Sequence, residues 1–394
     1  MYKRQKEILC PYCFERTDTS KLLFRCRNKK CPGQREDKIY AEYQGLLKAP
    51  IMGKTFIGEK KGLARFFGSS DKLLEAECPE CNKKTTQRAC PKCHYELKYV
   101  GNNIDEKMVA IIGGRASGKS SYIAVLINRL ENEVGKNFNA GLMADSDRTR
   151  NRYKNDFYKP IFIEKRMLGG TVTAERNPDV KKPMIFRMTF DNQGKRKAVN
   201  LVLFDTAGED MASDDAMFTH TRYISESDGI IFLLDPFQID TVRDLVPENL
   251  QDKQEDADPN EIVDRLYQLH EENQKVKSLQ KIKKPVAFTL SKSDALFPII
   301  EPDSGLHRSG EHFGYLNEAD VQSVHTEIST YLEEWMGSGF DNKVRTYFDC
   351  YRYFGVSAFG GSPIGEKIES ISPLRVEDPL LWVFNQLKII EAKK

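Results

Sequence analysis

Residues 108–121 read Met-Val-Ala-Ile-Ile-Gly-Gly-Arg-Ala-Ser-Gly-Lys-Ser-Ser. The apolar run that ends in glycine predicts a short buried strand. The residues after it predict a helix, because apolar side chains recur with helical spacing at Ile123, Leu126, Ile127, Leu130 and Val134. Between the two, residues 113–120 match G-x-x-x-x-G-K-[ST], a loop whose backbone N–H groups surround phosphate oxygens. A strand before the loop and a helix N-terminus after it predict a phosphate-binding site.

The residues of this loop have separate expected roles. Gly113 and Gly118 let the backbone bend toward phosphate oxygens. Lys119 is expected to reach the β- and γ-phosphates, and the Ser120 hydroxyl to bind Mg²⁺. The alternative is a glycine-rich turn with an exposed lysine, and the strand and helix on either side argue against it. The other expected nucleotide contacts are Arg115, Ala116, Ser117 and Ser121.

A second motif, Asp-Thr-Ala-Gly-Glu at 205–209, ends a predicted strand. Asp205 can hold a water of the Mg²⁺ shell, and the Gly208 N–H can contact the γ-phosphate. Strand ends of this kind place ligands at the edge of an open α/β sheet. On its own, this short motif is also compatible with an ordinary turn.

A third motif, Ser291-Lys-Ser-Asp294, follows the apolar run at 286–290. The Asp294 carboxylate can accept hydrogen bonds from N1 and N2 of guanine, a donor pair that adenine lacks. The stem of Lys292 can lie across the base. A fourth motif, Ser357-Ala358, follows the predicted strand 352–357 and can offer a backbone N–H to guanine O6. The alternative for the third motif is a solvated turn.

Further apolar runs predict strands at 184–190, 199–205 and 229–235. Amphipathic helices are expected between the strands, and a last helix at 378–390 opens with Asp378 as its N-cap and Pro379 in its first turn. Strands that are apolar throughout and alternate with helices imply an α/β fold with a mainly parallel sheet covered on both faces. Two stretches read as insertions, near 137–183 and near 245–260.

Eight of the nine cysteines lie in the first hundred residues. Closely spaced pairs in Cys-Pro-x-Cys contexts are typical of metal knuckles rather than secreted disulfides. Two sets of four thiolates suit tetrahedral Zn²⁺, about two ions per chain. Pairing of knuckles across the two sets is the alternative. The sets are Cys10, Cys13, Cys26, Cys31 and Cys78, Cys81, Cys90, Cys93.

The chain is therefore expected to have a first zinc ribbon at 1–40 and a connecting segment at 41–74. A second ribbon at 75–100 and a nucleotide-binding domain at 105–394 follow. Basic residues and aromatic rings interleave in the first ribbon, which is compatible with nucleic acid. With 60 basic and 58 acidic residues, however, the chain carries only +2, so a protein-docking or structural module is the better interpretation. The charged N-terminus lacks the apolar core of a signal peptide and the apolar runs are short, which predicts a cytoplasmic protein.

The order of the four motifs resembles that of TRAFAC-class, small-GTPase-like P-loop proteins over roughly residues 107–394. The addition of zinc ribbons is similar to the bacterial double-GTPase families, which work beside a second GTPase. This resemblance implies a six-stranded GTPase fold with nucleotide-dependent switch loops and GTP, GDP and Mg²⁺ as ligands. It also implies a protein partner, either a second GTPase or an activating protein, in a bacterial signalling or conflict system.

Three residues depart from the small-GTPase pattern. Arg115 occupies a position often filled by glycine, Glu209 stands where a water-orienting glutamine is usual, and Ser291 replaces Asn or Thr. Lys119, Glu209 and Arg115 are the expected catalytic residues, and the first two departures predict slow intrinsic hydrolysis. For the Mg²⁺-binding threonine of the first switch, Thr173 is favoured, with Thr171 and Thr149 as alternatives.

Three functional hypotheses follow from these motifs. The first is a GTP-hydrolysing switch that engages a partner through its loops and ribbons. The second is a GTP-holding scaffold with negligible turnover, for which Arg115 and Glu209 argue. The third is a zinc-ribbon ATPase that binds nucleic acid, and Asp294 argues against it because the carboxylate would stay unpaired opposite adenine.

Overall fold

The computed structural model describes residues 7–58, 75–97, 106–114, 116–169, 182–192, 195–203, 222–251, 258–273 and 280–393. The chain divides into two compact units, Met1–Asp105 and Glu106–Lys394. Among the described residues, no helix is both long enough and apolar enough to cross a bilayer.

The described part of the N-terminal unit consists of very short strands and one helix, because buried cysteine knuckles rather than a large apolar core occupy its interior. Its central sheet has the order β10-β9-β3-β6 and joins strands from both halves of the unit, so the two halves are not separate modules. The elements are β1 Glu7–Leu9, β2 Arg16–Asp18, β3 Leu23–Arg25, β4 Arg35–Glu36, α1 Lys38–Tyr43, β5 Ile51–Met52, β6 Thr55–Phe56, β7 Ala76–Glu77, β8 Lys84–Thr85, β9 Arg88–Ala89 and β10 Glu96–Leu97.

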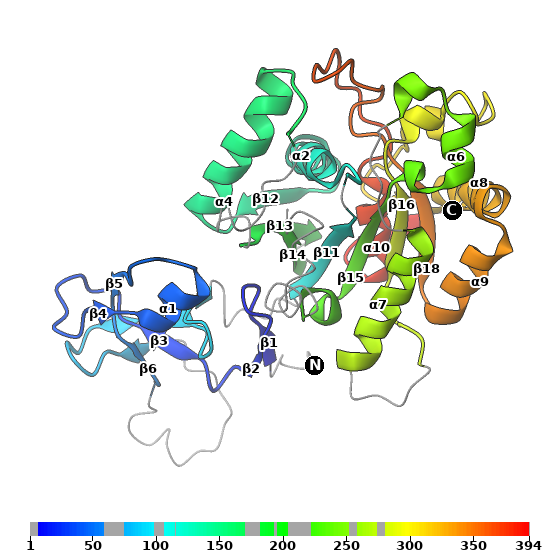
Figure 1. Ribbon diagram of the computed structural model, residues 1–394. Coiled ribbons are helices and arrows are strands. Elements are labelled where there is room, and N and C mark those ends of the chain that lie inside the picture. The colour runs from blue at the N-terminus through cyan, green and yellow to red at the C-terminus, as the bar shows by residue number, and fades with distance from the viewer. Residues whose placement is uncertain are drawn as a thin grey trace. The chain divides into compact units, whose positions relative to one another are not determined.

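The C-terminal unit is built on a seven-stranded sheet of order β12-β13-β14-β11-β15-β16-β18 (Figure 1). β12 and β13 run antiparallel to their neighbours, and the four other pairings, from β14 to β18, are parallel. The strands are β11 Glu106–Gly113, β12 Ala140–Ala144, β13 Met184–Asn192, β14 Lys195–Leu203, β15 Gly229–Leu234, β16 Val286–Leu290 and β18 Tyr351–Gly355, with a separate pair β17 Leu316–Asn317 and β19 Ala392–Lys393.

Helices cover both faces of this sheet, with α7 in front of it and α10 behind it in Figure 1. The helices are α2 Lys119–Arg129, α3 Gly135–Asn137, α4 Asp147–Arg152, α6 Asp240–Leu245, α7 Pro259–Asn273, α8 Glu318–Met336, α9 Ser338–Tyr347 and α10 Asp378–Gln386. Turns of π-helix lie at Leu130–Val134 and Tyr153–Ile163, and 3-10 turns at Pro236–Gln238, Glu248–Leu250, Ser293–Leu296 and Gly305–His307.

Side chains alternate between the two faces of β15. Ile231 and Leu233 join the larger core beneath α2 and α10. On the other face, Phe232 meets Phe288 edge to face with ring centroids 5.8 Å apart, and Phe288 meets Phe348 in the same way at 5.2 Å. Both faces of the central strands are therefore buried from solvent, which explains why their sequence is apolar along its length.

The predicted α/β fold with a mainly parallel, two-sided sheet is confirmed. Two details differ from the sequence analysis. The stretch near 137–183, read as an insertion, supplies β12 as an additional edge strand together with α4, so the sheet has seven strands rather than six. The last helix is capped at Glu377, and Asp378 is instead its first residue, turned toward Arg375 and His312.

Candidate functional site

The phosphate loop connects β11 to α2 with the geometry that the sequence predicts. A Cβ on Gly113 would lie 2.6 Å from Ser117 Oγ and 3.1 Å from the Leu233 carbonyl oxygen, so only glycine fits there. Gly118 has φ of +70° and forms the N-cap of α2, where no described side chain caps the helix. A helix N-terminus in this position is the place where backbone N–H groups and the helix dipole favour an anion.

Two other loop residues have local roles. Ala116 adopts a left-handed backbone with φ of +54°, which turns the loop back on itself. The Ser117 hydroxyl donates to the Gly114 carbonyl at 2.8 Å, and the side chain is buried. The Ser117 hydroxyl therefore stabilises the loop, and the contact of Ser117 with a nucleotide stays a prediction. Lys119 and Ser120 lie at the first turn of α2, where the sequence predicts them.

A cavity of about 360 Å³ opens beside this loop. Its walls come from segments that are distant in sequence: Gly118, Ser121 and Tyr122 of the loop and α2, the base motif Ser291–Asp294, and the loop that follows β18. A volume of this size is in the range of small-molecule sites. The cavity therefore brings the predicted phosphate and base motifs to one place.

The carboxylate of Asp294 is fixed on both sides. Ser357 Oγ donates to its Oδ1 at 2.5 Å, and Ser362 Oγ donates to its Oδ2 at 3.1 Å. Since an ionised carboxylate accepts about four hydrogen bonds, two hydroxyl donors leave capacity for two more. The arrangement holds an acceptor pair on the cavity wall, as recognition of guanine N1 and N2 requires.

Ser357 has a different role from the one predicted. Its backbone N–H donates to the Leu374 carbonyl at 3.0 Å, so it is not available to guanine O6, while its hydroxyl orients Asp294. The Ala358 N–H, from a residue that lines the cavity, is left for that contact. Ser291 is also buried: its N–H and its Oγ both donate to the Leu234 carbonyl, at 2.9 and 3.1 Å.

Several cavity residues were not found from the sequence, among them Met167, Phe237, Phe359 and Ser362. They lie on irregular segments that carry no motif. Met167 is brought in because its N–H donates to the Glu366 carbonyl at 2.6 Å, which ties its segment to the loop after β18. Residues of this kind reach the cavity through tertiary contacts, which the spacing of residues in the sequence does not predict.

Several predicted site residues lie outside the described residues, namely Arg115, Thr171, Thr173, Asp205, Gly208 and Glu209. Thr149, the remaining alternative for the switch threonine, is described. It is buried in α4, its hydroxyl lies 3.4 Å from the Ile185 N–H, and Ser146 caps the helix beside it. These contacts fit a structural threonine between α4 and β13.

The eight N-terminal cysteines form two groups, and the grouping crosses the two sequence sets. Cys10, Cys13, Cys90 and Cys93 form one group, and Cys26, Cys31, Cys78 and Cys81 form the other. The expected grouping of the cysteines within each sequence set is therefore wrong, and the alternative of knuckles paired across the sets agrees with the structure. The physical reason is the shared sheet, in which β3 pairs with β9.

The donor geometry fits a tetrahedral metal. Opposed Sγ atoms are 3.6 Å apart for Cys10–Cys93 and 3.8 Å for Cys31–Cys78. A tetrahedron with Zn–S bonds of about 2.3 Å has edges of about 3.8 Å. Both groups could therefore hold Zn²⁺. His94 belongs to neither group, since its Nδ1 lies 2.8 Å from Asp37 Oδ1.

The basic and aromatic residues of the first ribbon divide between its surface and its interior, and the exposed ones are Lys21, Arg27, Lys29 and Lys30. Phe14 and Phe24 are buried, and Arg25 is 2% exposed, held by Asp37 Oδ2 at 2.8 Å and by the Gly53 carbonyl at 3.1 Å. Tyr12 stacks on Tyr95. These buried or stacked side chains hold the unit together, so what remains on the surface of the pattern is basic rather than aromatic.

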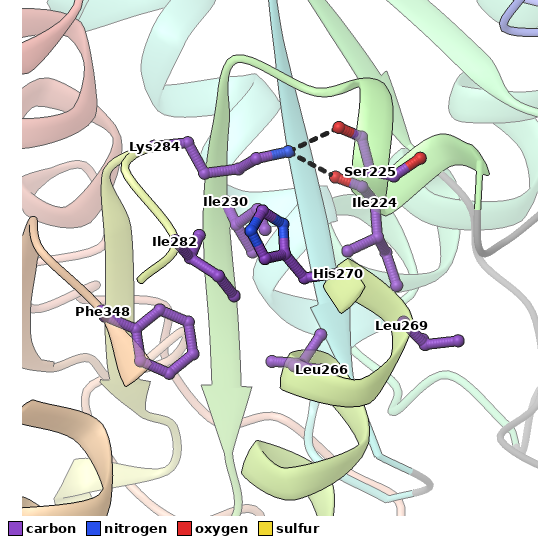
Figure 2. A pocket seen from close by; sticks show the side chains of 9 residues that line it. All are labelled: Ile224, Ser225, Ile230, Leu266, Leu269, His270, Ile282, Lys284 and Phe348. Carbon is purple, nitrogen blue, oxygen red and sulfur yellow. Dashed lines mark hydrogen bonds between the residues drawn. The ribbon is translucent and has the colours of Figure 1, made fainter. Parts of the chain in front are cut away.

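A small hollow lies at the opposite edge of the sheet, before β15 and β16 (Figure 2). The Lys284 ammonium donates to the Ile224 and Ser225 carbonyls at 2.9 and 2.7 Å, and His270 lies beside it among apolar side chains. Its volume of about 10 Å³ admits at most one water. It is a packing feature rather than a ligand site.

A glycine loop between a buried strand and a helix, with a fixed carboxylate on the wall of the same cavity, is the arrangement of a GTPase-like P-loop protein of the α/β class. Within that class, the chain belongs to the Double-GTPase 2 family, whose family model matches residues 107–334.

The chain is similar along nearly its whole length to one curated protein. It is 25% identical to the "Putative ESX-1 scaffolding and assembly protein SaeC" of Mycolicibacterium smegmatis, over 95% of this chain and 97% of that protein. It also aligns with the Ski7 GTPase-like domain of S. cerevisiae in its GTP-bound structure, at 13% identity and a TM-score of 0.31, over 71% of this chain and 50% of that one. The Ski7 structure with GDP and phosphate aligns at a TM-score of 0.29, over 64% of this chain and 43% of that one.

Proposed function

We propose that this protein binds GTP and GDP with Mg²⁺ and hydrolyses GTP slowly, as a switch that acts through a protein partner. The observation that carries the proposal is the placement of Asp294. Its carboxylate is held by Ser357 and Ser362 on the wall of the cavity that the phosphate loop also lines. Membership of the Double-GTPase 2 family supports the choice of nucleotide.

The expected preference for guanine follows from hydrogen-bond energies. Hydrogen bonds to a charged group are worth about 1.5–3 kcal/mol each, so each bond from N1 or N2 to Asp294 gives about tenfold or more in affinity. Adenine offers no such donor pair and would leave the carboxylate unpaired. ATP should therefore bind far more weakly than GTP.

The residues expected at the phosphate groups contribute charge and do not discriminate between bases. Lys119 would address the β- and γ-phosphates, and Ser120 with Asp205 would hold Mg²⁺, which neutralises the developing charge. Glu209 stands where glutamine usually orients water, and an ionised carboxylate can only accept hydrogen bonds. Slow turnover alone and faster turnover with a partner are the consequences, with Arg115 supplying positive charge from within the chain.

The N-terminal unit is the proposed docking module, folded around two Zn²⁺ ions. Among the described residues of this unit, six side chains are large, apolar and exposed: Ile39, Tyr43, Leu46, Leu47, Ile51 and Ile57. Tyr43 and Ile39 are four residues apart on α1 and so share one face, away from the buried Ala41. Apolar side chains gathered on so small a unit are typical of protein contacts. A second GTPase or an activating protein in the cytoplasm is the proposed partner.

One relative's description favours a second candidate, a GTP-holding scaffold with negligible turnover. SaeC carries the words scaffolding and assembly in its name. The two candidates share the same nucleotide site and differ only in the chemical step. Single-turnover hydrolysis, with and without the partner that co-purifies with the chain, separates them.

The binding proposal is tested by competition. Labelled GDP bound to the purified chain with Mg²⁺ should be displaced by GTP and GDP at concentrations where ATP is without effect. Lys119→Ala should weaken every nucleotide, because it addresses phosphate alone. Displacement by ATP and GTP at equal concentrations would remove the guanine assignment and restore the ATPase hypothesis.

A further inference from the structure

A short turn after β15, Asp235–Gln238, lies between the base motif and the phosphate loop, and no motif in the sequence marked it. Asp235 is the first residue after the strand, and its side chain is 5% exposed. Its Oδ1 accepts from the Phe237 N–H at 3.0 Å, and its Oδ2 accepts from Lys292 Nζ at 2.8 Å. One buried carboxylate thus fixes both the turn and the lysine of the base motif.

The ion pair determines the course of the Lys292 side chain. Lys292 has a left-handed backbone with φ of +50°, and its stem runs beside the phosphate loop. A Cβ on Gly118 would lie 3.9 Å from both Lys292 Cγ and Cε. The ammonium group lies 5.6 Å from the centroid of the Phe237 ring, and Phe237 and Lys292 both line the cavity. The methylene groups of Lys292 are therefore held along the cavity wall, where they form an apolar surface.

The turn also contacts the phosphate loop. Gln238 Nε2 is buried, has no hydrogen-bond partner among the described residues, and lies 3.3 Å from where a Cβ on Gly114 would be. Ser291, the residue before Lys292, is bonded twice to the Leu234 carbonyl, directly before Asp235. The turn is thus in contact with both halves of the nucleotide site.

A lysine side chain carries about 2 kcal/mol of rotamer entropy, so an unrestrained lysine makes a poor platform for a base. A buried charge partner removes that freedom before the ligand arrives, which is preorganisation. The arrangement also explains why a carboxylate can remain at a buried position: its ammonium partner and the Phe237 N–H compensate for the loss of water.

We propose that Asp235 is a positioning residue of the guanine subsite, which holds the Lys292 stem in place against the base. This inference rests on the proposed binding of guanine nucleotides. Asp235 does not itself touch the nucleotide, and its effect passes through Lys292. The two residues must therefore act as one unit in binding.

The test is a double-mutant cycle on GDP affinity in the full-length, zinc-loaded chain. Asp235→Asn keeps the shape and the acceptor for Phe237 N–H but removes the charge, and Lys292→Gln removes the ammonium. Each single variant should weaken GDP by about tenfold, the scale of one charge-assisted hydrogen bond. The double variant should be no weaker than Lys292→Gln alone, because coupled residues are not additive. Asp240→Asn is the control, since that carboxylate is exposed and pairs with Arg243 on its own helix.

A merely structural role for Asp235 predicts a different pattern. Asp235→Asn would then lower the thermal midpoint of the nucleotide-free protein and weaken GDP equally in the Lys292→Gln background. Additive losses, near a hundredfold for the double variant, would overturn the inference, as would unchanged GDP binding by Asp235→Asn. If the wild type does not bind GDP at all, the proposed function fails and the inference fails with it. If the wild type binds and the losses add, only the inference fails.

Discussion

The grouping of the cysteines predicts different zinc contents for two double variants, and comparing the two tests the grouping. In the structure, Cys10 and Cys90 belong to the same metal site, whereas Cys10 and Cys26 belong to different sites. Cys10→Ser with Cys90→Ser should therefore destroy one site and leave the other, lowering the zinc content from two ions per chain to one. Cys10→Ser with Cys26→Ser should remove a ligand from each site and bring the content to zero.

The magnitude follows from the coordination geometry. Sγ–Sγ distances of 3.6 and 3.7 Å in the first site and 3.7 and 3.8 Å in the second match the edges of a zinc–thiolate tetrahedron. Structural Zn²⁺ in small domains contributes about 10–16 kcal/mol at neutral pH, which is comparable to the whole stability of a domain. A site that loses a ligand should therefore lose its ion and its local fold together, not merely bind more weakly.

The assay is metal analysis by mass spectrometry on dialysed protein, with Cys350→Ser as the control because Cys350 lies in the other unit. Pairing within each sequence set would give the opposite pattern: one ion retained by the Cys10 and Cys26 variant, and none by the Cys10 and Cys90 variant. That result would refute the interleaved arrangement and the shared sheet of the N-terminal unit. Iron in place of zinc, with a visible absorption band, would refute the metal assignment.

Three other predictions follow. Gly113→Ala should weaken GTP and GDP by tenfold or more in equilibrium titrations, because its Cβ would lie 2.6 Å from Ser117 Oγ; unchanged affinity would show that the loop relaxes freely. Glu209→Gln should raise single-turnover GTP hydrolysis, because a neutral amide both donates and accepts, and an unchanged rate would remove Glu209 from the chemistry. Burial lowers the pKa of His312, but the Asp378 carboxylate outweighs it and leaves that pKa raised. The stability that His312 contributes is therefore fully present below about pH 6.5 and lost as pH rises through the raised value. Denaturant titrations should show His312→Ala costing more at pH 6 than at pH 9, and equal costs would contradict the ion pair.

The sheet could be predicted because its strands carry their signal locally. Runs such as 229–234 and 286–290 are almost entirely apolar, which is typical of a parallel strand buried on both faces. β12 was missed because the stretch near 137–183 that contains it reads as polar and glycine-containing, and because the burial of Ala140–Ala144 is only partial. An edge strand can be exposed along much of its length, so its burial pattern gives a weak signal. Its pairing with β13 depends on the tertiary structure.

The site was predictable to the extent that residues act through short spacing. Gly113 and Gly118 lie where the phosphate loop requires them, and Asp294 lies on the cavity wall. Asp235 and Ser362 could not be found, since each acts on a partner more than fifty residues away in sequence. The cysteine grouping failed for the same reason, because the spacing within a knuckle does not determine which knuckle faces it.

Recognition of guanine by Asp294 is tested most directly by comparing the binding affinities of GDP and IDP. Inosine lacks the N2 amino group and so loses one hydrogen bond to the carboxylate. Isothermal titration of the wild type should give an affinity for GDP about tenfold or more above that for IDP, from about 1.5–3 kcal/mol for one such bond. Asp294→Asn should weaken GDP and reduce the difference between the two ligands. Equal affinities for GDP and IDP in the wild type would contradict the account.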